Sequence, residues 1–144
     1  MNRRDVLVGA GALAVAAVAR AGQKGTPSEA HHHDAAGSPL VDATADCLKK
    51  GEVCEQHCFT LLGSGDTSMA SCAMSVRDML ASTRSLFTLA SAGSKHTPLV
   101  ARSCAQICKD CEVECRKHAD KHQPCRDCAD ACARMQQEIA KLPA

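Results

Sequence analysis

Cysteine spacing is the feature that most constrains this sequence. The 144-residue chain contains eleven cysteines, and within each cluster neighbouring cysteines are three, four or seven residues apart. Side chains three or four residues apart share one face of an α-helix, so this spacing predicts helices that each carry a stripe of thiols. The predicted stripes are Cys47, Cys54 and Cys58, then Cys72 alone, then Cys104, Cys108, Cys111 and Cys115, and finally Cys125, Cys128 and Cys132.

The thiols take the place of the hydrocarbon that normally fills a helical core. Between residues 97 and 144 the cysteines outnumber Leu, Ile, Val and Phe taken together. The chain has two Phe, no Trp and no Tyr, and its formal net charge is +1. Such a chain offers neither aromatic rings to stack on bases nor a basic surface for phosphates, so nucleic acid and anionic membranes are excluded as partners.

Helix boundaries follow from capping residues, prolines and glycines. Ser38 with Pro39 and Thr97 with Pro98 are typical helix starts, and Pro124 opens a further helix after a very short turn at His122 and Gln123. Glycines at 63 and 93 are typical stops. The expected helices cover about 39–62, 67–92, 97–121 and 124–142. Four similar helices joined by short turns predict an all-α fold, an antiparallel four-helix bundle over residues 39–144.

The first 38 residues differ in composition from the rest. Arg3 and Arg4 precede an uncharged run from Val6 to Val18, and small residues follow up to Ala21. This pattern predicts a twin-arginine-type signal peptide at 1–21 and export to the periplasm. The apolar run is shorter than a membrane-spanning helix, which needs about 20 residues. A membrane-anchoring helix is the alternative. Residues 22–38 are expected to form a flexible linker, in which His31, His32 and His33 either capture a metal ion weakly or are simply solvated.

Three structural roles can be considered for so many thiols. Small apolar packing explains one or two buried cysteines but not eleven. A disulfide framework suits an exported protein, but the count is odd, and cysteines four apart on one helix hold their Cβ atoms about 6 Å apart where a disulfide needs about 3.8 Å. Bridges between helices remain as an alternative. Metal binding explains the whole set, because cations relieve the repulsion between neighbouring thiolates.

The spacing favours Cu(I) among the metals. Zinc prefers closed groups of four ligands, and the sequence does not divide into such groups. Cys108, Cys111 and Cys115 match part of an iron–sulfur motif, but a cysteine and a proline of that motif are missing. Cu(I) is soft, accepts two or three thiolates, and shares bridging sulfurs between neighbouring sites. A zinc or general heavy-metal buffer and a disulfide-linked helical scaffold stay as alternatives.

The sequence also resembles a known family over about residues 40–140. The motifs that carry the resemblance are Cys47-x6-Cys54-x2-His57-Cys58-Phe59, Met69-x2-Cys72, Cys104-x3-Cys108-x2-Cys111-x3-Cys115 and Cys125-x2-Cys128-x3-Cys132. Together they are similar to the copper storage proteins. The resemblance implies a bundle whose lumen holds multiple Cu(I) ions on cysteine pairs, and a homo-oligomer, often a tetramer. It also implies that His57 and Met69, at the open end between the first two helices, take part in copper access or binding.

Several positions depart from that pattern or allow two interpretations. Thr83 and Met135 stand where further cysteines are expected, so the predicted copper capacity is lower than in cysteine-richer relatives. Met79 and Met135 either offer thioethers to Cu(I) or fill the core. His118 and His122 either close one end of the lumen or satisfy the last carbonyls of a helix. Gly51 lies on the thiol face and either permits close helix approach or is merely tolerated.

Catalysis finds no support in this sequence. No nucleophile with a paired base and an orienting acid can be singled out. We therefore expect a protein that sequesters copper rather than an enzyme, with copper ions as its ligand and no membrane association once the signal peptide is removed. A copper donor or acceptor protein is a further expected partner that the sequence does not identify.

Overall fold

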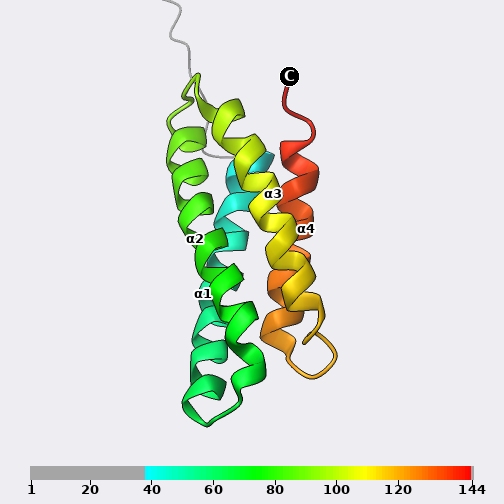
Figure 1. Cartoon of the computed structure of the whole chain (residues 1–144). Coiled ribbons are helices and arrows are strands. Elements are labelled where there is room, and N and C mark those ends of the chain that lie inside the picture. The colour runs from blue at the N-terminus through cyan, green and yellow to red at the C-terminus, as the bar shows by residue number, and fades with distance from the viewer. Residues whose placement is uncertain (1–37, 144) are drawn as a thin grey trace, which may run out of the picture. The chain divides into compact units, whose positions relative to one another are not determined.

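The computed structural model describes residues 38–143, which form an antiparallel four-helix bundle (Figure 1). The elements are α1 (Pro39–Gly63), a short 3₁₀ helix η1 (Thr67–Met69), α2 (Ala70–Ser91), α3 (Thr97–Arg116) and α4 (Gln123–Ile139). The all-α prediction is confirmed. The expected signal peptide at 1–21 and the expected linker at 22–38, with its three histidines, lie outside the described residues except for Ser38.

The helices are arranged as a square around a central lumen. Each helix packs against two neighbours, and within residues 38–143 the backbones of the diagonal pairs α1/α3 and α2/α4 do not approach each other. The α1–α2 and α3–α4 connections share one end of the bundle, and the α2–α3 connection lies at the other (Figure 1). We call the first the histidine end, because it carries His57, His118 and His122, and the second the apolar end.

The helix starts agree with the prolines in the sequence. Pro39, Pro98 and Pro124 each occupy the first turn of a helix, where the missing backbone N–H costs nothing. The expected cap at Ser38 is only positional, because its side chain makes no capping hydrogen bond. Asp66 is a true cap: its carboxylate accepts a hydrogen bond from the backbone N–H of Ser68 at 3.1 Å.

The end of α1 lies one residue beyond the prediction. Gly63 belongs to the helix, and the chain turns at Gly65, whose φ of 96° is accessible mainly to glycine. The backbone N–H of Asp66 reaches the carbonyl of Leu61 and that of Gly65 reaches Leu62, both at 3.0 Å, as in a Schellman motif. Gly93, with φ of 60°, ends α2 in the same way, as predicted.

The predicted ends of the last two helices are wrong. Helix α3 stops at Arg116 instead of about Lys121, and α4 stops at Ile139 instead of about Leu142. After Arg116 the hydrogen bonds tighten to the third residue back, as from His118 N–H to the Cys115 carbonyl at 3.1 Å. The guanidinium of Arg126 donates to the Ala119 carbonyl at 2.7 Å and fixes this connection. A longer turn therefore replaces the two-residue one.

The core divides along the bundle axis into sulfur and hydrocarbon. Hydrocarbon side chains such as Leu40, Leu86 and Ile139 are buried toward the apolar end, and the cysteines, together with methionines and small apolar side chains, fill the rest of the lumen. Among the described residues, no helix combines the length and the apolar character that crossing a membrane requires.

Candidate metal centre

All eleven cysteine side chains are directed into the lumen. Each has a relative exposure of 0%, and none forms a disulfide. The stripe periodicity therefore predicted their burial correctly, and the interhelical bridges that the sequence left open are not present. Buried thiols in such number are more than apolar packing requires, and those that ionise repel each other until a cation lies between them.

The sulfur atoms are spaced as ligands of shared metal ions would be. Two sulfur ligands about 2.3 Å from one ion lie about 3.8–4.0 Å apart in tetrahedral or trigonal geometry. The observed Sγ–Sγ distances are 3.8 Å for Cys54–Cys125, 3.8 Å for Cys47–Cys132, 3.6 Å for Cys72–Cys115, and 4.0 Å for Cys54–Cys115, Cys104–Cys108 and Cys111–Cys115. The packing of the helices alone therefore places the sulfur atoms at separations suited to metal binding.

Ten of the cysteines form four overlapping groups, in each of which all Sγ atoms lie within 4.8 Å of one another. The groups are Cys54, Cys58, Cys72 and Cys125; Cys54, Cys115 and Cys128; Cys111, Cys128 and Cys132; and Cys47, Cys108 and Cys132. Cys54, Cys128 and Cys132 each belong to two groups, so the thiols form a continuous path along the lumen. The expectation that no group of four exists is wrong, because α1, α2 and α4 bring four thiols together near the histidine end.

Cys104 lies beside the innermost group and has polar neighbours. Its Sγ is 4.0 Å from that of Cys108, 3.7 Å from the Thr83 hydroxyl and 3.5 Å from the Ser82 hydroxyl. Thr83 is fully buried, so its hydroxyl occupies the lumen position at which a second α2 cysteine is expected. Met135, on the face of Cys128 and Cys132, is also fully buried and packs in the core.

Hydrogen bonds among the thiols divide them into acidic and proton-retaining members. Bonds from Cys108 and then Cys132 lower the pKa of Cys47 to about 4, and a bond from Cys111 is the main cause that lowers the pKa of Cys128 to about 6. The donors hold their protons more tightly: the pKa of Cys108 is raised, chiefly by its bond with Cys104. The thiolates in such a lumen accept hydrogen bonds from neighbouring thiols. A soft cation that binds to the sulfur atoms displaces the protons of those thiols.

The histidine end brings together side chains from both connections. His57 Nε2 lies 3.0 Å from His122 Nδ1, and the rings of His118 and His122 are 6.5 Å apart. Hydrogen bonds from Ser68 lower the pKa of Asp66, and the nearby His122 and His118 lower it further. The side-chain pairing of His122 across the bundle favours closure of this end over the helix-capping alternative.

Met69 is fully buried in η1, at the same end as His57. The structure therefore places both residues where the sequence expected them, and their role in metal binding stays a prediction. His96 is exposed in the α2–α3 connection.

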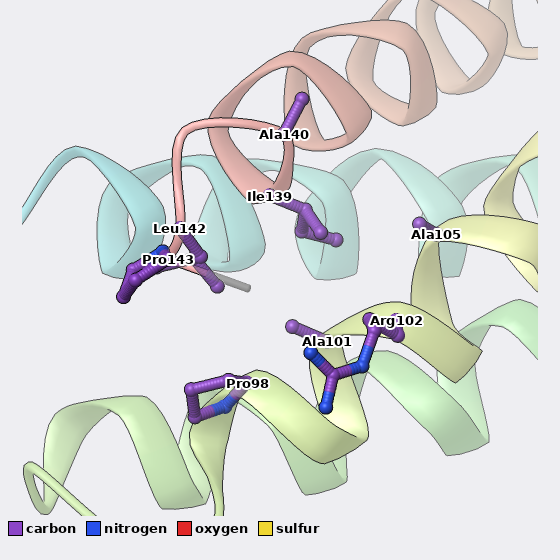
Figure 2. A pocket seen from close by; sticks show the side chains of 8 residues that line it. All are labelled: Pro98, Ala101, Arg102, Ala105, Ile139, Ala140, Leu142 and Pro143. Carbon is purple, nitrogen blue, oxygen red and sulfur yellow. The ribbon is translucent and has the colours of Figure 1, made fainter.

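One cleft outside the lumen lies between α3 and α4 at the apolar end (Figure 2). It is lined by Pro98, Ala101, Arg102, Ala105, Ile139, Ala140, Leu142 and Pro143. Its walls are hydrocarbon apart from one guanidinium, and none of these residues offers sulfur or imidazole. The lumen is therefore the candidate site.

Comparison with known proteins agrees with this site. An all-α bundle with a thiol-filled lumen defines a metal-storing class of protein, and a family model described as copper storage protein matches residues 30–144. The chain belongs to the copper storage protein family. Among solved structures it is similar to the copper storage protein Ccsp from Streptomyces lividans, loaded with 10 copper equivalents. The match has a TM-score of 0.66 and 22% identity, and it covers 78% of this chain and 91% of that chain. No match to a curated protein was found.

Proposed function

We propose that this protein stores multiple Cu(I) ions on the thiolates of its lumen. The single observation that carries the proposal is the continuous path of buried, unbridged cysteines with sulfur separations suited to metal bridging. Membership of the copper storage family supplies the identity of the metal. Copper is cargo here and not a resident cofactor, because the same lumen has to fill and empty.

The sharing of thiols favours Cu(I) over zinc. An isolated tetrahedral zinc site needs four thiols of its own, and one group of four exists. The remaining groups contain three thiols, and each shares at least one with its neighbour. Cu(I) accepts low coordination and bridging sulfurs, so it makes use of shared thiols that zinc would leave incompletely coordinated.

The number of copper ions that one chain can hold depends on how its thiols are shared between the ions. Eleven cysteines used in pairs hold roughly five ions, and fully bridging thiolates hold roughly eleven. The Streptomyces relative was loaded with 10 copper equivalents, which lies within this range. Thr83 occupies a lumen position where a further cysteine is expected, so a capacity below that of cysteine-richer relatives is expected here.

Copper enters the lumen at the histidine end in this proposal. His57 and His122 meet there at 3.0 Å, the group of four thiols lies directly behind them on α1, α2 and α4, and Met69 is buried beside them. Imidazole and thioether groups bind Cu(I) less tightly than clustered thiolates do, which suits ligands that pass ions inward. The apolar end is closed by hydrocarbon, and its histidine, His96, is exposed in the α2–α3 connection.

The sequence is the basis for three further parts of the proposal: the location of the protein, its oligomeric state and its lack of enzymatic activity. The twin arginines and the apolar run at 1–21 support export to the periplasm, and the family resemblance supports a homo-oligomer, with a tetramer as the first expectation. Storage requires no catalytic step, so we assign no enzymatic activity. Copper donor and acceptor proteins would complete the pathway of the ions.

A competition titration tests the metal assignment. Reduced protein is titrated anaerobically with Cu(I) against a chromophoric Cu(I) chelator, and a parallel sample is titrated with zinc against a zinc chelator. We expect several copper ions per chain to be withheld from the chelator, and at most about one zinc ion, at the group of four. Equal stoichiometric uptake of several zinc ions would replace this proposal with a general heavy-metal buffer.

A further inference from the structure

The innermost thiol group draws its ligands from only three of the four helices. Cys47 comes from α1, Cys108 from α3 and Cys132 from α4, and their Sγ atoms lie within 4.8 Å of one another. Helix α2 carries a single cysteine, Cys72, which belongs to the group near the histidine end. The wall that α2 forms at the inner group is therefore without a thiol.

Met79 places a different kind of sulfur on that wall. It is fully buried, and its Sδ lies 3.4 Å from the Sγ of Cys47, the shortest sulfur–sulfur separation among the hydrogen-bonded pairs of the described residues. The thioether of Met79 is therefore directed at the sulfur of Cys47 in the inner group, and not only at the surrounding hydrocarbon. Two sulfurs at this distance lie within reach of one metal ion with a bond length of about 2.3 Å.

Gly51 provides the space that this position of Met79 needs. A Cβ at residue 51 would lie 2.6 Å from the terminal methyl carbon of Met79, closer than real Cβ contacts. Gly51 follows Cys47 by one helical turn, so Met79 lies across α1 with its methyl group against the glycine and its sulfur against the cysteine. The Thr83 hydroxyl donates to the same Sδ at 3.4 Å, from one turn further along α2.

We infer that Met79 is a thioether ligand for Cu(I) at the inner group, which completes a mixed site with the thiolates of Cys47, Cys108 and Cys132. This inference rests on the proposed function and adds a ligand to it. A thioether carries no charge and no proton, so it adds a soft donor to a buried site without adding to the repulsion among the thiolates. The Thr83 hydroxyl donates a hydrogen bond to this sulfur, and copper binding would replace that hydrogen bond at the sulfur lone pair.

Selenium absorption measures this contact directly. The full chain is prepared with selenomethionine and loaded anaerobically with Cu(I), and selenium-edge X-ray absorption is recorded. We expect a copper neighbour at bonding distance from selenium. We expect Met79→Leu to reduce that component to what Met69 contributes, while exposed Met74→Leu keeps it unchanged. Leucine has nearly the volume of methionine, so the packing is retained. We also expect the Met79→Leu protein to lose one copper ion to a competing chelator at a lower chelator concentration than the Met74→Leu protein does.

Each outcome decides a separate question. Loaded protein without a selenium–copper contact, or a contact that Met79→Leu leaves unchanged, would overturn the assignment of Met79. If Met79→Leu does not fold, the contact must persist in Met69→Leu and in Met135→Leu. The copper content of the same samples tests the proposed function independently: an unmodified chain that holds many copper ions without this contact refutes the ligand only, and one that holds no copper refutes storage.

Discussion

Small residues on the lumen face determine where sulfur lies. Gly51 is buried between Cys47 and Cys54 on α1, and the side chains of Met79 and Leu80 occupy the space beside it. The sequence allowed either close approach or simple tolerance at this position. The structure decides for close approach, because a single added carbon would overlap two neighbouring side chains.

The first prediction concerns this glycine. Gly51→Ala places its Cβ 2.6 Å from Met79 and 2.8 Å from Leu80, so we expect the overpacking, typically about 1–3 kcal/mol, to outweigh the about 1 kcal/mol that alanine gains in a helix. Gly63→Ala is the matched control, since nothing lies within 4 Å of its added carbon. Thermal unfolding of the copper-free proteins measures both. Equal midpoints for the two variants would show that Gly51 is not required for packing.

His57 carries the second prediction. It is half-buried at the histidine end and pairs with His122, so we expect His57→Ala to slow copper transfer into the lumen without changing the final copper content. Exposed His96→Ala, in the connection at the opposite end, is the control. Stopped-flow measurement of Cu(I) transfer from a weak chelator gives the rate. A rate unchanged from the control, with the same final content, would place copper access elsewhere.

The four helices contribute unequally to the lumen, and α2 contributes least. It carries one cysteine, while its other buried side chains include Val76, Met79 and Thr83. Thr83 lies 3.7 Å from the Cys104 sulfur, at a distance typical of the thiol pairs. Because Cys104 is the one cysteine outside the four overlapping groups, this part of the lumen is short of ligands rather than of space.

The third prediction adds the missing sulfur. We expect Thr83→Cys to raise the copper content by about one ion per chain, because its thiol would face Cys104. Thr88→Cys introduces a thiol at an exposed position one to two turns away on the same helix and serves as the control. Copper per chain after anaerobic loading and desalting is the measurement. An equal increase in both variants would mean that any added thiol binds copper, regardless of the lumen.

The sequence predicts correctly those features of the helices that depend on one residue type, namely the buried faces and the starts. Cysteine periodicity predicted the buried faces, and Pro39, Pro98 and Pro124 predicted the starts, because helix phase and the first turn depend on local sequence. The end of α3 was missed, because it depends on a hydrogen bond from Arg126 to Ala119 across the connection. The group of four thiols and the pairing of His57 with His122 were missed for the same reason: they join helices, and spacing within one helix does not specify the register of another.

At the scale of the whole molecule, the lumen exchanges protons for copper. Hydrogen bonding among neighbouring thiols raises the pKa of Cys54, Cys72, Cys108 and Cys111, so these thiols are protonated near neutral pH. The pKa of Cys47 is lowered to about 4 by hydrogen bonds from Cys108 and Cys132, so this thiol is among the most readily ionised. Uptake therefore releases fewer protons than there are cysteines, and acid opposes it.

The fourth prediction follows from the sign of that exchange. For each thiol proton that a copper ion displaces, we expect the apparent affinity to fall about tenfold per unit decrease in pH between about pH 8 and about pH 5. Copper retained against a fixed concentration of chelator, corrected for protonation of the chelator, provides the measurement. An affinity that does not change with pH would show that the lumen thiols are already deprotonated before copper arrives.

Counting copper ions and reactive thiols on the same loaded sample tests storage in the lumen most directly. The fully reduced chain is loaded anaerobically with excess Cu(I), desalted, and analysed for copper and for thiols that react with a colorimetric reagent. The account predicts about five or more copper ions per chain, with all eleven cysteines protected from the reagent. One or two copper ions per chain, with most cysteines still reactive, would contradict it.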